Sequence, residues 1–293
     1  MKEFELYEPE SIEEASRLLA KFGGRGRILA GGTDLLVELK RGQLNLAAVI
    51  NLKKIKGLNK IRFTKKEGLR IGAMVTWTQL LESKPVSRHY PLLRKAAEKM
   101  GCMQIRNVGT LAGNLAHASP AANGPIPLLI YEATCVIQGP NGRRVIPVEK
   151  IFGGVQKNTL RRSEVLTEIL VPLPLAGAQG TYYKFGLRRA MDLAVVGVGA
   201  LVRTKNGTFD EVRIALGSVA PKPFRVKKAE RLLKGKRIED RLIRDAGETA
   251  AAESAPASAR PSASAGAAQP GTAPRPRICF PAQRQPTGRA RAA

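Results

Sequence analysis

The chain has 293 residues, 43% of them hydrophobic, which is enough for two or three buried units. Its formal net charge of +25 would suit nucleic-acid binding, but the aromatic residues (5%) are too sparse and scattered to form a base-stacking surface. Three widely spaced cysteines without a CxxC pair, and only two histidines, provide no recognisable ligand set for an iron–sulfur cluster or structural zinc. Neither nucleic-acid binding nor a metal centre is therefore expected.

The sequence shows neither a signal-peptide pattern nor a membrane-spanning segment. Residues 1–15 are acidic and amphipathic, unlike a secretory signal peptide. No run approaches the ~20 apolar residues that a membrane-spanning helix needs. Because few unpaired cysteines fit a reducing compartment, we expect a cytoplasmic protein without a membrane span.

The first 55 residues alternate between strand and helix patterns. Strands are predicted at residues 4–7, 27–30 and 47–52, and helices at 11–22 and 33–41. Ser11 is expected to cap the first helix, with Glu14 three residues further on. This order predicts a small parallel α/β unit over residues 1–55.

The pattern changes over residues 56–175. Hairpins are predicted at 60–75, turning at Glu67-Gly68, and at 133–148, turning at Asn141-Gly142. Between the hairpins we expect helices at 76–82 and 91–100 and a glycine-rich turn region at 105–117. A strand is expected after the second hairpin, at 164–171. The segment therefore predicts a mixed unit with antiparallel strands.

A third unit is predicted over residues 176–253. Its strands are expected at 182–187, 194–204 and 211–218, with Asn206-Gly207 turning between the last two, followed by helices near 226–233 and 238–253. Residues 254–293 are mostly Ala, Pro, Ser, Arg and Gly, and cannot bury enough surface to offset the entropy lost on ordering. We therefore predict that this tail is disordered.

The first candidate binding segment is a glycine turn where a predicted strand meets a predicted helix: Ala30, Gly31, Gly32, Thr33, Asp34 and Leu35. Backbone N–H groups at such a turn can point at phosphate oxygens, and the helix dipole favours an anion there. The alternative is an ordinary strand-to-helix turn. The nearby Gly24-x-Gly26 pair is not a dinucleotide-binding fingerprint, because Leu29 occupies the third glycine position.

The second candidate segment spans residues 105–120. Gly109 and Gly113 alternate with Thr110, Asn114 and Ser119, so the segment offers small residues and donors but few acids. That composition suits wrapping a pyrophosphate. The alternative is a buried glycine loop without a ligand.

Together, the two segments resemble the FAD-binding medium subunit of the xanthine dehydrogenase and carbon monoxide dehydrogenase family. That family has an AGGT-type loop and, after an R-N-x-G stretch, a T-[IL]-G-G-N loop. The matches are Ala30–Asp34 and Arg106–Asn114, with Ala112 in place of the first glycine of G-G-N. The likeness continues at residues 152–154, 168–172 and 184–194, and covers about residues 1–253.

The resemblance implies an α+β chain with a two-subdomain FAD-binding fold like that of vanillyl-alcohol oxidase (the PCMH type). Residues 1–55 and 56–175 would form its halves, with FAD between them. Residues 176–253 would form a smaller α+β domain that covers the flavin.

The resemblance also implies a set of FAD contacts and no catalytic residue. Gly31 to Asp34 would meet the pyrophosphate from one side, and Thr110, Gly113 and Asn114 from the other. Lys184 and Asp192 would lie near the ring; alternatively they are a surface charge and a turn cap. Asn123 stands where relatives often carry Asp, and His117 is best read as a packing or hydrogen-bonding residue. The implied cofactor-binding set is Ala30, Gly31, Gly32, Thr33, Asp34, Leu35, Arg106, Gly109, Thr110, Gly113, Asn114, Ser119, Asn123, Lys184 and Asp192.

The implied function is electron transfer within a larger complex. In this family, substrate is oxidised at a molybdenum cofactor on a large subunit, and a small subunit with two [2Fe–2S] clusters links it to the flavin. The present chain would pass electrons between those clusters and an acceptor such as NAD or a quinone. Two alternatives remain open: a non-enzymatic module that binds another phosphate ligand or nucleotide through the same loops, and a self-contained flavin oxidase.

The tail departs from the family pattern. Relatives continue with a helical segment that starts near I-S-P-x-x-D-x-R, whereas this chain runs from Glu253 into low complexity. A frameshift in a GC-rich gene would explain the change, and residues 176–253 would then be a truncated domain. The alternative is a genuine disordered tail; sequencing the gene distinguishes the two.

Overall fold

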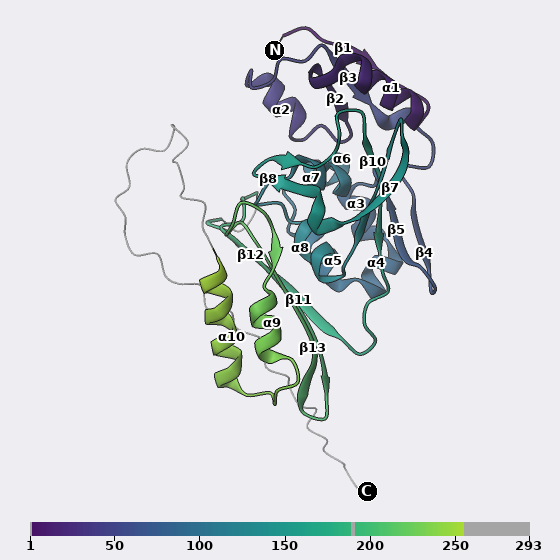
Figure 1. Ribbon diagram of the computed structural model, residues 1–293. Helices are drawn as coiled ribbons and strands as arrows, with labels where there is room; N and C mark the ends of the chain where they lie inside the picture. The colour runs from purple at the N-terminus through teal and green to yellow at the C-terminus, as the bar shows by residue number, and fades with distance from the viewer. Residues whose placement is uncertain (1, 189–190, 255–293) are drawn as a thin grey trace, which may run out of the picture.

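The computed structural model describes residues 2–188 and 191–254, which form three consecutive groups of strands and helices (Figure 1). The predictions for the tail, apart from Ser254, lie outside the described residues. Within residues 2–188 and 191–254, no helix is long and apolar enough to cross a membrane.

The amino-terminal group contains a parallel three-stranded sheet in the order β1-β3-β2. Its elements are β1 (Glu5–Tyr7), α1 (Ile12–Phe22), β2 (Gly26–Leu29), α2 (Leu35–Lys40) and β3 (Ala48–Asn51). The Ser11 hydroxyl caps α1 by accepting a bond from the Glu14 N–H, as expected, although the Glu14 carboxylate accepts from the Glu10 N–H instead. The predicted alternation of strands and helices is confirmed.

The middle group contains an antiparallel five-stranded sheet in the order β4-β5-β10-β6-β7. Its strands are β4 (Ile61–Thr64), β5 (Gly68–Gly72), β6 (Thr134–Gly139), β7 (Gly142–Pro147) and β10 (Val165–Val171), with a separate small pair, β8 (Phe152–Gly154) and β9 (Lys157–Asn158). Both predicted hairpins are confirmed, and their turn residues Gly68 and Gly142 have φ values of 83° and 94°. Short 3-10 turns follow α1, β3 and β7 at Gly23–Arg25, Leu52–Lys54 and Val148–Ile151.

The helices of the middle group differ most from the sequence prediction. The observed helices are α3 (Trp77–Glu82), α4 (Lys84–His89), α5 (Pro91–Glu98), α6 (Met103–Val108), α7 (Leu111–His117) and α8 (Pro125–Ile130). The prediction of a turn region at residues 105–117 is wrong: α6 and α7 occupy it, separated only by Gly109 and Thr110. Thr110 starts the new helix by capping the Gly113 N–H. Helices α4 and α8 were not predicted, and α8 is buried on every side, so it lacks an amphipathic period.

The carboxyl-terminal group is an antiparallel sheet in the order β11-β12-β13-β14, with two helices against it (Figure 1). Its elements are β11 (Gln179–Phe185), β12 (Val196–Lys205), β13 (Thr208–Gly217), β14 (Phe224–Arg225), α9 (Lys227–Leu233) and α10 (Asp240–Glu253). The predicted turn at Asn206-Gly207 is confirmed, with both residues at positive φ. The α10 side chains Ala246 and Ala250 are buried in the core that α9 shares with the sheet.

The sheet contacts the middle group through glycines. A Cβ atom placed on Gly199 would lie 2.5 Å from Ile130 Cδ1, and one on Gly197 would lie 2.5 Å from Ile126 Cδ1. Strands β12 and β13 therefore approach α8 more closely than side-chain-bearing residues would allow. This close packing fixes the sheet against the helix.

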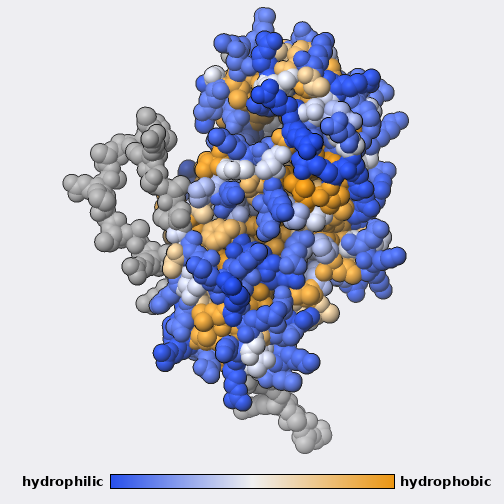
Figure 2. Space-filling view, viewed as in Figure 1, coloured by the Kyte–Doolittle hydropathy of each residue, from blue (hydrophilic) through white to orange (hydrophobic). Residues whose placement is uncertain are grey.

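Large aromatic residues fill the core of the middle group. Trp77 and Tyr90 are almost completely buried, and the Tyr90 hydroxyl donates to the Val171 carbonyl at 3.2 Å. The outer surface differs: the face in Figure 2 is mostly hydrophilic and interrupted by apolar patches.

Candidate FAD site

The first candidate loop leaves a row of backbone donors free. Helix α2 begins at Leu35, two residues later than predicted, because a turn closed by the Leu36 N–H and the Gly32 carbonyl (3.0 Å) precedes it. Among the described residues, the N–H groups from Gly31 to Leu35 find no hydrogen-bond acceptor. Consecutive free N–H groups at a helix start form a favourable site for an anion.

The two candidate loops touch each other. A Cβ atom on Gly31 would lie 2.1 Å from the Val108 carbonyl oxygen and 2.7 Å from Gly109 Cα. A Cβ atom on Gly109 would in turn lie 3.6 Å from Thr33 Cγ2. Only glycine at position 31 permits this backbone-on-backbone contact, so the structure brings the two predicted loops together.

Thr110 anchors the second loop. Its side chain is buried, and Oγ1 accepts the Gly113 N–H at 2.9 Å while its carbonyl accepts the Asn114 N–H at 3.0 Å. The Trp77 N–H also donates to the Gly109 carbonyl at 3.1 Å. The N–H of Gly113 is therefore occupied by the helix cap. Ala112, the departure from the family pattern, lies inside α7, where alanine is favourable.

Four other predicted side chains are bonded to the backbone of the same region. Asn114 Oδ1 accepts the Gly124 N–H (3.1 Å), Ser119 Oγ accepts the Ala121 N–H (3.3 Å), Asn123 Nδ2 donates to the Lys99 carbonyl (3.0 Å) and Arg106 Nη1 donates to the Met100 carbonyl (3.0 Å). These bonds shape the loops between α5 and α8. Side chains fixed in this way cost little further entropy on binding a ligand.

A second cluster forms around the Lys99 carbonyl. Lys184 Nζ donates to it at 3.2 Å, so Lys184 and Asn123 share one acceptor. Lys184 also donates to the Asp192 carbonyl at 2.6 Å. Burial, together with the nearby Lys99 charge, lowers the pKa of Lys184. Thus β11 brings this ammonium group to Asn123, although 61 residues separate them in the sequence.

The Asp192 carboxylate is used within its own loop. Oδ2 accepts the Arg188 N–H at 2.8 Å, and this bond helps to lower the pKa of the carboxyl group. The turn-cap interpretation therefore describes what its side chain does in the structure. Its carbonyl, rather than its carboxylate, meets Lys184.

His117, the last residue of α7, lies near two carboxylates, one in the first loop and one in α2. Its Nε2 lies 3.8 Å from Asp34 Oδ1, and its Nδ1 lies 3.7 Å from Glu38 Oε1. His117 was expected to be a packing or hydrogen-bonding residue, whereas nothing in the sequence pointed to Glu38. Lys99 was not predicted either, because it contributes a main-chain carbonyl, which leaves no signal in the sequence. Within the described parts of the chain, no group of His, Cys, Asp and Glu is placed to hold a metal ion.

The geometry fits a dinucleotide cofactor with a pyrophosphate. Free N–H groups from Gly31 to Leu35 suit phosphate oxygens, and the contact at Gly31 places the second loop beside them. The Lys184 cluster supplies hydrogen-bonding groups at a second position. The arrangement is that expected of a protein that binds a phosphate-bearing cofactor, with main-chain N–H groups free to donate to the phosphate oxygens.

Comparison with known proteins identifies the family. Residues 2–174 match the family described as the FAD binding domain in molybdopterin dehydrogenase, and residues 181–266 match the CO dehydrogenase flavoprotein C-terminal domain. The chain belongs to this family: it is an FAD-binding oxidoreductase subunit of the molybdenum hydroxylase type.

Several relatives agree over most of the chain. The carbon monoxide dehydrogenase medium chain of Hydrogenophaga pseudoflava is 35% identical over 251 residues, covering 85% of this chain and 86% of the relative. The xanthine dehydrogenase FAD-binding subunit of an Escherichia coli strain is 34% identical over 221 residues, covering 75% of each chain.

Solved structures agree as well. Carbon monoxide dehydrogenase from Hydrogenophaga pseudoflava superposes with a TM-score of 0.84 at 36% identity, covering 87% of this chain and 88% of the other. Quinoline 2-oxidoreductase from Pseudomonas putida 86 gives a TM-score of 0.82 at 29% identity, covering 88% and 90%. The expected family, the α+β fold class and FAD as the cofactor are therefore confirmed.

Proposed function

We propose that this chain is the electron-transfer subunit of a three-subunit molybdenum hydroxylase. Its partners would be a large subunit with the molybdenum cofactor and a small subunit with two [2Fe–2S] clusters. Electrons would leave to an acceptor such as NAD or a quinone. The observation that carries this proposal is the pair of touching glycine loops with free N–H groups at Gly31–Leu35.

The chain's own residues would bind and orient the cofactor. The N–H groups of Gly31 to Leu35 would donate to the pyrophosphate, while Thr110 and Asn114 hold the opposing loop in place. Bound FAD supplies reversible electron and hydride chemistry that the protein lacks. We further propose the unit limits 1–55, 56–175 and 176–253, with the last unit covering the flavin.

Lys184 would act on the ring side. Its ammonium group is half-buried and held between two carbonyls, so its position is fixed. A fixed positive charge there would favour a cofactor that gains negative charge on reduction. The lowered pKa of Lys184 reflects the cost of that burial.

Exposed apolar residues beside Lys184 support association with other subunits. Phe185, Leu187 and Leu193 have exposed fractions of 57%, 84% and 74%. Large apolar side chains grouped in this way are typical of protein–protein contact surfaces. Covering them with a partner would also exclude water from the neighbouring site.

The electron-transfer role can be tested with the FAD-loaded full chain. The protein is reduced anaerobically with dithionite, freed of excess reductant, and mixed with NAD⁺ or with a soluble benzoquinone. We expect the absorbance near 450 nm, the approximate position for an oxidised flavin, to return with one of the two acceptors. If neither restores it faster than buffer alone, the proposed role in delivering electrons to such an acceptor is wrong.

A further inference from the structure

Glu132 occupies a position that normally selects glycine. It follows α8 with φ at 55°, in the left-handed region. Its N–H donates to the Leu129 carbonyl (3.2 Å), and the N–H of Ala133 donates to the Leu128 carbonyl (2.9 Å). These two bonds are typical of a helix end at which the residue after the helix adopts the left-handed conformation. Glycine is preferred at that residue, because a Cβ atom is unfavourable in this conformation. The strained backbone of a glutamate at this position must therefore be stabilised by contacts outside the helix.

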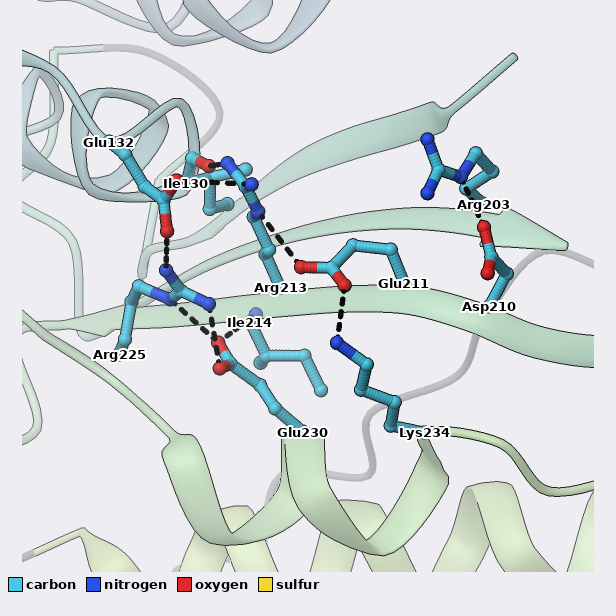
Figure 3. Close-up of polar contacts among 10 residues, drawn as sticks. All are labelled: Ile130, Glu132, Arg203, Asp210, Glu211, Arg213, Ile214, Arg225, Glu230 and Lys234. Atoms are coloured by element: carbon cyan, nitrogen blue, oxygen red, sulfur yellow. Dashed lines mark hydrogen bonds and ion pairs between the residues drawn. The ribbon is translucent and has the colours of Figure 1, made fainter. Parts of the chain in front are cut away.

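The Glu132 carboxylate binds two arginines of the carboxyl-terminal sheet. Oε1 accepts from Arg225 Nη1 at 2.6 Å, and Oε2 lies 3.0 Å from Arg213 Nη2 (Figure 3). The arginine side chains are only 14% and 13% exposed. Each oxygen of one carboxylate from the middle group therefore holds a different, mostly buried guanidinium from β13 or β14.

Both arginines are fixed by further contacts, so Glu132 meets groups that are already in position. Arg225 makes a bidentate pair with Glu230, with two bonds of 2.8 Å, and Glu230 also accepts the Ile214 N–H. Arg213 donates to the Ile130 carbonyl at 3.0 Å. The strands carrying these arginines therefore cannot move away from the end of α8 without breaking several bonds.

The same sheet reaches the candidate FAD site at its other end. Lys184 on β11 pairs with Gly197 on β12, which pairs with Gly217 on β13, so the three residues lie side by side across the sheet. Next to Gly217, the Ser218 N–H donates to the Pro120 carbonyl at 2.8 Å. The sheet is thus attached to the middle group at both ends of α8: near Asn123 through Lys184, and at Glu132.

We propose that Glu132 is a positioning residue for the flavin site: by clamping Arg213 and Arg225 it holds the carboxyl-terminal sheet at the angle that brings Lys184 to the Lys99 carbonyl. The inference rests on the proposed placement of Lys184 beside the flavin. It explains why an acid occupies a glycine position: the carboxylate is retained for a contact between two units, at the cost of local backbone strain.

Three full-length variants test the inference. Glu132→Gln keeps the shape and removes the charge. Glu132→Gly also removes the carboxylate but relieves the backbone, so a merely local role for residue 132 predicts a variant that is no worse than wild type. Glu211→Gln is the matched control, because Glu211 contacts the same Arg213 (3.5 Å) but belongs to the carboxyl-terminal sheet itself.

The readouts are the FAD dissociation constant, iodide quenching of flavin fluorescence and hydrogen exchange of β11. We expect both Glu132 variants to bind FAD roughly fivefold or more weakly, as loss of a charge-assisted hydrogen bond implies, with faster quenching and faster β11 exchange. Glu211→Gln should bind FAD within about twofold of wild type, because its partners Arg213 and Lys234 belong, like Glu211, to the carboxyl-terminal group.

Wild-type values for both Glu132 variants would overturn the inference, as would faster exchange without any change in FAD binding. A wild-type chain that binds no FAD would instead refute the proposed function. In that case, unchanged hydrogen exchange of β11 in both Glu132 variants would also show that Glu132 does not hold the sheet in place. Faster exchange would show that Glu132 holds the sheet, but without a role in flavin binding.

Discussion

The contact between the two glycine loops predicts a large effect from one methyl group. In Gly31→Ala, the added Cβ would lie 2.1 Å from the Val108 carbonyl oxygen and 2.7 Å from Gly109 Cα. Both are backbone atoms, so no side-chain rotation can relieve the overlap, and the loops must separate by about 1 Å to reach ordinary contact distances. Overpacking of this kind costs roughly 1–3 kcal/mol.

The assay compares thermal unfolding and FAD titration for wild type, Gly31→Ala and Gly24→Ala. Gly24 is the matched control, because a Cβ there would meet nothing within 4 Å. For a chain of this size, the expected cost lowers Tm by roughly 2–10 °C, and separation of the loops should weaken FAD binding about tenfold or more. Gly24→Ala should change Tm by no more than about 2 °C. A Gly31→Ala protein that melts and binds FAD like the control would refute the reasoning.

Three further predictions concern packing and charge. Gly199→Ala should destabilise the protein by about 1 kcal/mol, because the added Cβ would meet side-chain atoms, Ile130 Cδ1 at 2.5 Å and Ile126 Cγ2 at 2.7 Å, which can shift more easily than the backbone atoms beside Gly31; Ile130→Val in the same chain removes the first of these overlaps and should recover part of the loss in urea unfolding, and no recovery would contradict the assigned contact. Tyr182→Phe should leave stability unchanged or raise it by up to about 1 kcal/mol, because the buried hydroxyl has no partner among the described residues; Tyr90→Phe, which loses a bond to Val171, should lower it by about 1 kcal/mol, and the reverse order would contradict both assignments. The bidentate bond from Arg144 lowers the pKa of Glu164 below 4.5, so its stabilising effect is complete above that pH and disappears as the pH falls through the lower folded-state pKa; Glu164→Gln should therefore lose less unfolding free energy between pH 6 and pH 3 than wild type, and an equal loss would contradict the assignment.

Local signals in the sequence predicted much of the framework. Asn141-Gly142 and Asn206-Gly207 each formed the expected turn, since these residue pairs tolerate positive φ. The strand that ends before Gly31 was predicted to within one residue, and Gly31 does lie against a second loop. Such features depend on a few neighbouring residues, which a single sequence displays directly.

Features that depend on tertiary contacts were not predictable. Helix α8 is apolar on all sides because strands β12 and β13 cover it, so its sequence has no helical period. The close approach at Gly199 requires knowledge of Ile130, which lies 69 residues away. The end of α8 could not be predicted from a glycine, because Glu132 occupies the position where glycine is usual. The arginines that bind its carboxylate come from β13 and β14, which are distant in the sequence.

The candidate site shows the same division. The two loops follow from residue patterns, whereas the meeting of Asn123 and Lys184 at the Lys99 carbonyl follows only from the packing of β11 against the loops after α5. Every residue has a main-chain carbonyl, so the role of the Lys99 carbonyl as an acceptor cannot be recognised from the residue type. The sequence therefore indicated the two glycine loops directly, whereas the contacts around the Lys99 carbonyl could be seen only in the folded chain.

The most direct test of the central claim is titration of the purified full chain with FAD, followed by release and identification of the bound cofactor. The account predicts one FAD per chain and absorbance bands at about 370 and 450 nm, which oxidised flavins share. It also predicts that Gly31→Ala binds FAD more weakly than Gly24→Ala. A folded, colourless protein that takes up no added FAD would contradict the assignment of the two loops as the pyrophosphate site.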